Sequence, residues 1–224
     1  RERAAPRVAR AGNVGKSSPE KGTRMKRIGT WAAALLVFGM APLPALAKTP
    51  ALAETPAPPA WIAPDFVVPT LVEGPGFKLV PLGPPLVEVD YRAYMSSIAH
   101  LQATFTRSTG WPHEGLTLKD AMVDMETEAA RFAARASFAY AVLTPDGSRE
   151  RGCVYVYPSK IAGHDAQVVL WVTAAEYEAG FDAELYTWTK DWIARDWPFR
   201  RVAYPGRSIA WEEWDAAVAE SKGE

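Results

Sequence analysis

Apolar positions in the second half of the chain recur at two different spacings. Eight of them repeat every three or four residues, at Leu118, Ala121, Met122, Met125, Ala129, Phe132, Ala133 and Ala136. This period is typical of a helix with one buried face. Thr117 and Asp120 form a capping-box pattern at its start. The pattern therefore predicts a helix from Leu118 to Ala136 whose apolar side faces the core.

Short runs of β-branched and aromatic residues predict strands. They cover residues 77–80, 138–143, 152–157, 166–172 and 201–204. Residues 145–148 read Pro-Asp-Gly-Ser and predict a tight turn, so the second and third strands form a hairpin. The run 168–172 is apolar throughout, which is typical of a strand covered on both faces.

Three further helices complete the expected order of elements. They are predicted at 88–105, at 182–196 after a cap at Asp182, and from a cap at Ser208 to Ala219. The sequence thus predicts strand, two helices, three strands, helix, strand and helix. This order indicates an α/β (α+β) domain with a mixed sheet, in which antiparallel hairpins are followed by one β-α-β crossover.

The N-terminal part of the chain has the pattern of an export signal. Met25, Lys26 and Arg27 precede an apolar run of about 13 residues, and Ala45-Leu46-Ala47 supplies small residues for cleavage. Because a membrane-spanning helix needs roughly 20 apolar residues, we expect a cleaved signal at 25–47 and an exported, periplasmic protein. Contact with a membrane is expected only through an uncleaved leader. Residues 1–24 contain no Met and are interpreted as upstream read-through. If the leader results from a wrongly assigned translation start, we expect the domain to be cytoplasmic.

Residues 48–75 are rich in Pro and Ala and are interpreted as a linker, which leaves one domain at 76–220. Cys153 is the only cysteine, so an intramolecular disulfide is excluded. Its strand-like surroundings predict a small buried side chain. His100, His113 and His164 are far apart in the sequence and show no metal-ligand spacing, so no metal site is expected.

The charge of the chain is unevenly distributed. Residues 1–47 hold nine Lys or Arg and two acids. Subtracting these from the totals of 25 and 26 leaves 16 bases and 24 acids, a net charge of −8 for the remainder. A nucleic-acid partner is therefore not expected, because phosphate binding needs a basic surface.

Several short segments carry a resemblance to a known family. They are His100-Leu101 with Thr104-Phe105, Trp111-Pro112, Gly152-Cys153-Val154-Tyr155, Trp197-Pro198-Phe199 and Val202-Ala203-Tyr204-Pro205-Gly206-Arg207. Together with the order of elements, these segments make residues 77–214 similar to an uncharacterised bacterial GNAT-like family, which has the acyl-CoA N-acyltransferase fold. The resemblance covers about 140 residues.

The resemblance implies a cleft between the strands at 166–172 and 201–204, in which GNAT enzymes place the pantetheine arm of acetyl-CoA or another acyl-CoA. The residues that it places beside the cofactor are Val172, Thr173 and Gly180. The phosphate-binding motif of the family, Arg or Gln followed by spaced glycines, is missing from residues 173–181. Four acids lie there instead, at Glu176, Glu178, Asp182 and Glu184, and no Lys or Arg occurs between Trp171 and Thr189.

The topology of the family also suggests catalytic candidates, with Glu176 as base and Tyr204 as proton donor. The structural alternative for the acids is that they complement the dipole of a helix N-terminus. Among nine Trp residues, Trp111, Trp171 and Trp197 are candidates for contacts in the ligand cleft.

Two functions follow from these observations. The chain is an N-acyltransferase that moves an acyl group from acyl-CoA to an amine, or it is an exported, non-catalytic GNAT-fold protein that has lost CoA binding. In the second case a small molecule or peptide occupies the cleft.

Overall fold

A six-stranded sheet forms the centre of residues 61–223, which are the residues that the computed structural model describes. The predicted read-through at 1–24, the export signal at 25–47 and the linker residues before Trp61 lie outside this range. Within it, no helix has the length and apolar character needed to cross a membrane.

The strands lie in the sheet in the same order as in the chain. They are β1 (Val72–Gly74), β2 (Phe77–Pro81), β3 (Phe138–Leu143), β4 (Glu150–Pro158), β5 (Ala166–Val172) and β6 (Val202–Ala203). Neighbours from β1 to β5 pair antiparallel, whereas β5 and β6 pair in parallel. This arrangement confirms the predicted mixed sheet with antiparallel hairpins and one β-α-β crossover.

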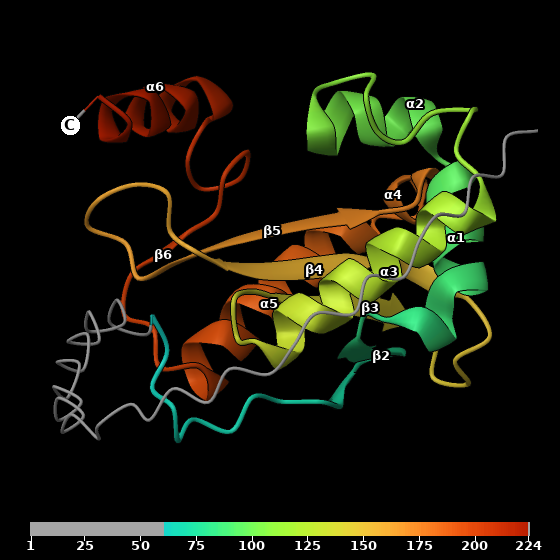
Figure 1. Ribbon diagram of the computed structural model, residues 1–224, viewed down its shortest axis with the longest axis horizontal. Helices are drawn as coiled ribbons and strands as arrows, with labels where there is room; N and C mark the ends of the chain where they lie inside the picture. Colours follow the sequence, from blue (N-terminus) through green and yellow to red (C-terminus); the bar gives the residue numbers. More distant parts are fainter. Residues whose placement is uncertain (1–60, 224) are drawn as a thin grey trace, which may run out of the picture. The chain divides into compact units, whose positions relative to one another are not determined.

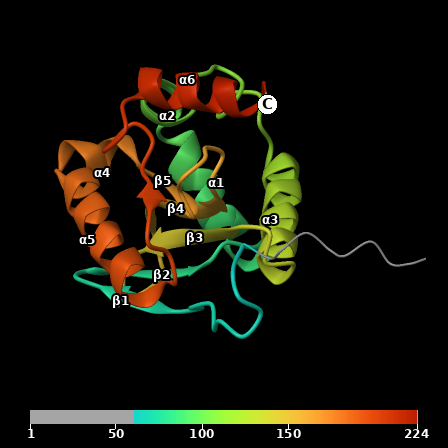
Figure 2. The ribbon, with the colours of Figure 1, turned by 90° about the vertical axis from the view of Figure 1, so that its left-hand side faces the viewer.

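Helices cover both faces of the sheet. They are α1 (Val87–Met95), α2 (Ile98–Leu101), α3 (Leu118–Ala133), α4 (Ala174–Glu178), α5 (Phe181–Asp196) and α6 (Trp211–Ser221). Helix α5 lies on one face, and α1 and α3 lie on the other (Figure 2). Helices α2 and α6 lie along the edge of the sheet beyond β5 (Figure 1).

Burial of both faces explains the continuous apolar runs of the central strands. Phe138, Tyr140 and Val142 belong to the core beneath α5, whereas Ala139 and Ala141 face α1 and α3. Every residue of β3 is buried. Successive side chains of such a strand point into two different cores, so every position is apolar. The usual alternation of apolar and polar residues along a strand is therefore absent.

The predicted helix at 88–105 consists of three segments instead of one. Helix α1 ends at Met95, α2 covers Ile98–Leu101, and a π-helical turn follows at Gln102–Thr106. The break falls at two serines. The Ser96 hydroxyl donates to the carbonyl of Ala93 at 2.6 Å, and serine side chains that bond the backbone in this way compete with helix continuation.

The linker predicted at 48–75 extends too far, because its described part belongs to the domain. The Trp61 indole donates to the carbonyl of Arg135 at 2.8 Å, Ile62 is buried in the core, and β1 pairs with β2. Prolines favour an extended chain, and an extended segment with apolar side chains can lie on the core.

Three local differences lie in the segments that border the predicted cleft. Helix α4 forms where no helix was predicted, with the Thr173 side chain accepting from the amide of Glu176. Helix α5 begins at Phe181 with Gly180 as its N-cap, so Asp182 lies in its first turn and does not cap it. Helix α6 begins at Trp211 with Ala210 as its N-cap, so Ser208 does not cap it.

Candidate functional site

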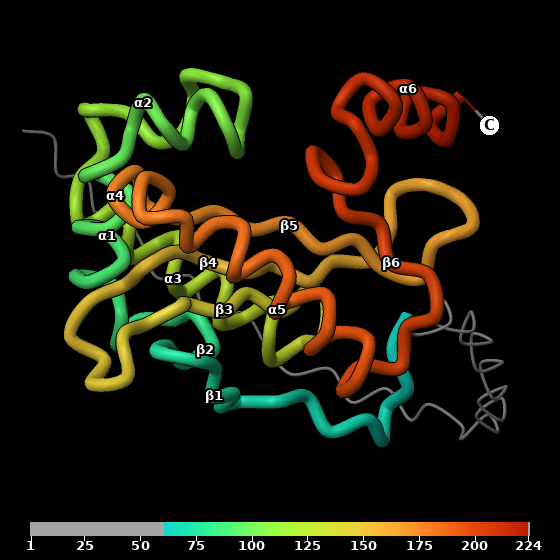
Figure 3. The backbone as a smooth tube through the Cα atoms, turned by 180° about the vertical axis from the view of Figure 1, so that it is seen from behind, coloured from blue at the N-terminus to red at the C-terminus, as the bar shows by residue number. Residues whose placement is uncertain are grey.

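The separation of β5 and β6 creates a cleft at the edge of the sheet. Only Ala166 and Gln167 of β5 pair with β6, and the chain of β6 then leaves the sheet (Figure 3). A cavity of about 250 Å³ occupies the space beyond this point. Its floor is the second half of β5, from Val169 to Val172. On this side, β5 has no strand partner within residues 61–223 from Val168 onward.

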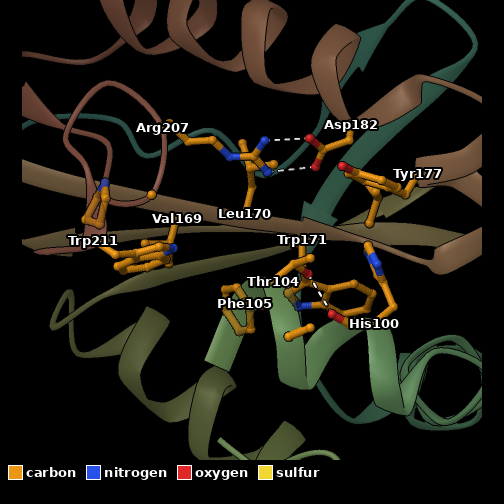
Figure 4. Close-up of a pocket in the computed structure, with 14 residues that line it drawn as sticks. His100, Thr104, Phe105, Val169, Leu170, Trp171, Tyr177, Asp182, Arg207 and Trp211 are labelled. Carbon is orange, nitrogen blue, oxygen red and sulfur yellow. Dashed lines mark hydrogen bonds and ion pairs between the residues drawn. The ribbon is translucent and has the colours of Figure 1, made fainter. Parts of the chain in front are cut away.

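Side chains from three other parts of the chain form the walls of the cleft. His100, Thr104 and Phe105 come from α2 and the π-helical turn, on one side of β5. Tyr177 and Asp182 come from α4 and α5, and residues 205–207 with Trp211 follow β6. Figure 4 shows Arg207 and Asp182 on one side of β5, and Thr104, Phe105 and His100 on the other.

Helix α4 is held against α2 by two contacts. The amide of Ala174 donates to the Ser97 hydroxyl at 2.9 Å, and the rings of His100 and Tyr177 lie 4.9 Å apart. The break in the predicted helix at Ser96 and Ser97 therefore has a consequence for the site. It places Ser97 where it fixes the start of α4, and it turns His100 toward the cleft.

A one-residue bulge in β4 directs two charged side chains to opposite faces. Gly152 pairs with Val142 and Glu150 pairs with Leu143, so Arg151 has no partner across the hairpin. The Arg151 guanidinium lies 3.4 Å above the ring of Phe181 on the α5 side, whereas Glu150 enters the core between β4 and α1. Bulges redirect side chains in this way.

Glu176, the predicted base, is paired with two arginines. Its carboxylate accepts from Arg149 and from Nε of Arg151, the latter at 2.9 Å. It is 6% exposed and does not line the cleft. Burial raises the pKa of Glu176, but the bonds from Arg151 and Arg149 outweigh burial, so the pKa falls below its usual value. A carboxylate held in this way is a weak base.

Tyr204, the predicted proton donor, lies in the core beneath α5. It is 8% exposed and packs against Tyr186, with ring centroids 5.6 Å apart. Burial raises its pKa. Its neighbour Pro205 lines the cleft, but Tyr204 does not. The structure therefore places neither Glu176 nor Tyr204 in the cleft, and their catalytic roles stay predictions.

The residues predicted beside the cofactor lie at the end of the cleft nearest α4 and α5. Val172 lines the cavity, Thr173 caps α4, and Gly180 is the N-cap of α5 with a φ of 84°. Asp182, in the first turn of α5, accepts from Arg207 at 2.7 Å. The acids that the sequence groups in this stretch are thus partly neutralised by Arg149, Arg151 and Arg207, which come from other segments.

The three candidate tryptophans have three different positions. Trp171 lines the cleft, and its indole donates to the Tyr155 hydroxyl at 3.3 Å. Trp111 lies in a neighbouring cavity on the α1 and α3 side. Trp197 is 5% exposed and packs in the core with Phe138 and Tyr140. Sequence reasoning missed Arg207 and His100 as cleft residues, although both lie in the segments that carry the family resemblance.

Cys153 is buried, as predicted, and lies beside two buried acids. Its Sγ is 2.9 Å from Oε1 of Glu150 and 3.9 Å from Oδ1 of Asp90. These atoms form the one group within residues 61–223 with possible metal ligands. Burial raises the pKa of Asp90 to about 7 and that of Glu150 well above its usual range. The Glu150 carboxyl and the Cys153 thiol therefore hold their protons at neutral pH, whereas Asp90 is partly ionised.

Comparisons with known proteins find similar structures but no match by sequence. No family model and no curated protein matches the chain. Among solved structures, the ribosomal-protein-S5-alanine acetyltransferase from Vibrio fischeri has a TM-score of 0.50 at 12% identity, over 66% of this chain and 81% of that one. The microcin C7 self-immunity acetyltransferase MccE, solved with acetyl-CoA and AMP, has a TM-score of 0.48 at 14% identity, over 70% and 83%. The fold of this chain is GNAT-like.

Proposed function

We propose that the cleft between β5 and β6 binds the pantetheine arm of an acyl-CoA, and that the chain transfers the acyl group to an amine. The observation that carries this proposal is the edge of β5 beyond Gln167, which has no strand partner on its β6 side and forms the floor of a cavity of about 250 Å³. The backbone N–H and C=O groups of an unpaired strand edge are free to form hydrogen bonds with a ligand. The two amides of a pantetheine arm supply such partners in an extended chain.

The local sequence near the cleft contains only acids, but ion pairs with distant arginines make the folded cleft more favourable to an acyl-CoA. Like charges repel an incoming pyrophosphate, but Glu176 is paired with Arg149 and Arg151. Asp182 is paired with Arg207, whose side chain is 28% exposed. Arg207 lines the cavity, so its guanidinium is available to a phosphate oxygen that competes with Asp182.

His100 is the side chain in the cleft best suited to move a proton. In the proposed reaction, an amine nitrogen attacks the thioester carbonyl, a C–N bond forms, and the C–S bond breaks. The proton lost by nitrogen goes to the imidazole of His100, and the thiolate takes a proton from solvent or from the Tyr177 hydroxyl. Imidazole commonly serves this role in general acid–base catalysis.

The test is calorimetric titration of acetyl-CoA into the full chain. We expect micromolar binding to the natural protein and none to Val169→Trp, because the larger side chain fills the cleft. The matched control is Val67→Trp, at a position that is 85% exposed. We expect this variant to bind acetyl-CoA like the natural protein. Thermal melting verifies that both variants fold. Absence of binding at millimolar acetyl-CoA contradicts the proposal.

A second function, binding without catalysis, is favoured by helix α4. This helix occupies the stretch where the family carries its glycine-rich loop, and the amides of Ala174 and Glu176 are already bonded to Ser97 and Thr173. Release of free thiol from acetyl-CoA in the presence of a mixture of amines separates the two functions. Thiol release above the blank supports the transferase, and binding without release supports a binding protein.

Export bears on the same choice, because acyl-CoA is expected to be scarce outside the cytoplasm. We propose from the sequence that residues 25–47 are removed and that the mature chain is periplasmic. Mass spectrometry of the periplasmic fraction is expected to find an N-terminus at Lys48. A cytoplasmic product that retains residues 25–47 contradicts export and removes this objection to acyl-CoA as donor.

A further inference from the structure

A second cavity, of about 310 Å³, lies between β4 and the helices α1 and α3. Phe105 lines both this cavity and the cleft, so the two spaces are neighbours. Trp111 and Asp90, described above, also line it. The proposed acyl transfer makes no use of this cavity.

Aromatic rings form much of its wall. They belong to Tyr94, Phe105, Trp111, Tyr155 and Tyr157. The ring centroids of Tyr94 and Trp111 lie 5.1 Å apart, and those of Phe105 and Tyr155 lie 5.8 Å apart. All of these rings except Tyr94 are only partly buried. The faces of aromatic rings attract organic cations.

The charged groups of the cavity are mostly acidic. Its lining includes Asp90, Asp124 and Glu128, against the single cation Arg131. Arg131 bonds to Oε1 of Glu128 at 2.7 Å. In the described part of the chain, neither Asp90 nor Asp124 forms a salt bridge with a base. The cavity is therefore lined by three acids and one base.

At the base of the cavity, a buried hydroxyl without a hydrogen-bond partner lies near a buried carboxyl group. Asp90 is 4% exposed, and its neighbours are the thiol of Cys153 and the carboxyl of Glu150. Tyr94 lies one turn further along α1, is 2% exposed, and has a buried hydroxyl with no hydrogen-bond partner. Buried polar groups are nearly always bonded, so the unpartnered hydroxyl of Tyr94 indicates a missing ligand, and the neighbouring carboxyl of Asp90 favours one that carries positive charge.

We propose that this cavity binds an organic ammonium ion, with its nitrogen at Asp90 and Tyr94 and its carbon atoms against the aromatic rings. The inference goes beyond the proposed acyl transfer and does not rest on it, because neither the cavity nor its test involves an acyl donor. If both are correct, the ammonium site lies directly behind Phe105 of the acyl-donor cleft.

Binding is expected to depend on pH. The titratable and charged groups around Asp90 are Tyr94 on α1, Asp124, Glu128 and Arg131 on α3, and Glu150, Cys153, Tyr155 and Tyr157 on β4. Burial raises the pKa of Asp90 to about 7, and it also raises the pKa of Asp124. A bound cation favours the ionised carboxylates, so the ammonium ion binds more tightly at pH 8 than at pH 6 and releases protons.

The experiment titrates choline and n-butylammonium into the full chain in the absence of acyl-CoA. Each cation has an uncharged control of similar size, 3,3-dimethyl-1-butanol for choline and n-butanol for n-butylammonium. The test variant is Asp90→Asn, which keeps the size of the side chain. The matched variant is Asp191→Asn, at an exposed position of α5 that does not line this cavity.

We expect at least one of the cations to bind, its uncharged control to bind at least tenfold more weakly, and Asp90→Asn to lose at least tenfold in affinity. Asp191→Asn is expected to bind like the natural protein. Equal binding of cation and control, full affinity in Asp90→Asn, or no binding of either cation would overturn the inference. Because no acyl donor is present, each of these results leaves the test of the cleft unaffected.

Discussion

At the scale of single residues, charges that are neighbours in the sequence find their partners far away in the chain. Glu176 is 27 residues from Arg149 and 25 from Arg151, and Asp182 is 25 residues from Arg207. The local sequence contains only acids, so it indicates repulsion of a phosphate. The fold reduces that repulsion by pairing Glu176 and Asp182 with three arginines.

Asp90 gives a prediction about stability and pH. Its pKa in the folded chain, about 7, is above its ordinary value of 3.8 because burial disfavours the charged form. Between these two values the folded state binds more protons than the unfolded state, so this group lowers the free energy of unfolding as pH rises. Asp90→Asn removes the penalty. We expect the variant to be more stable than the natural chain by on the order of 4 kcal/mol at pH 8.

Urea denaturation at pH 5 and pH 8 checks this prediction. The stability difference between Asp90→Asn and the natural chain is expected to grow with pH, and Asp191→Asn shows no such growth. A difference that is the same at both pH values would mean that Asp90 is not protonated in the folded state.

At the scale of elements, the close approach of β4 to β5 depends on Gly152. A Cβ atom at this position would lie 2.0 Å from the carbonyl oxygen of Trp171 and 2.8 Å from Cα of Val172. Both are backbone atoms of the strand that forms the floor of the cleft. The bulge at Arg151 immediately precedes Gly152, and the Arg151 side chain bonds to Glu176.

We therefore expect Gly152→Ala to destabilise the chain by about 2 kcal/mol or more, since overpacking against backbone cannot be relieved by a rotamer change. The matched variant is Gly83→Ala, where the nearest side-chain atom to a new Cβ would be 3.5 Å away, an ordinary contact. Thermal or urea unfolding measures both variants. Equal stability of the two would show that β4 and β5 are less closely packed at this point.

At the scale of the whole molecule, periodicity predicted the parts of the fold that depend on local sequence. The strands at 138–143 and 166–172 and the helix that begins at Leu118 lie where they were expected. The order of elements also predicted the parallel pairing of β5 with β6. These elements have regular apolar patterns and clear turn or cap residues, so their local signals agree with the tertiary structure.

Elements that depend on distant contacts were not predicted. Strand β1 exists because β2 pairs with it, and α4 is fixed by Ser97, 77 residues before Ala174. The cleft also depends on contacts between residues that are distant in the sequence. Val172 was identified through the family resemblance and Trp171 among the tryptophans, whereas His100 and Arg207 reach the cleft from segments whose position the sequence pattern does not give.

The most direct test of the account is amide NMR of the labelled full chain with and without acetyl-CoA. If the pantetheine arm lies along the free edge of β5, the amides of residues 169–172 and of Gly206 and Arg207 shift on binding, and amides along the unpaired edge of β5 exchange more slowly with solvent. Val169→Trp shows neither change, and Val67→Trp shows both. Shifts confined to other parts of the chain, or none at millimolar acetyl-CoA, would contradict the account.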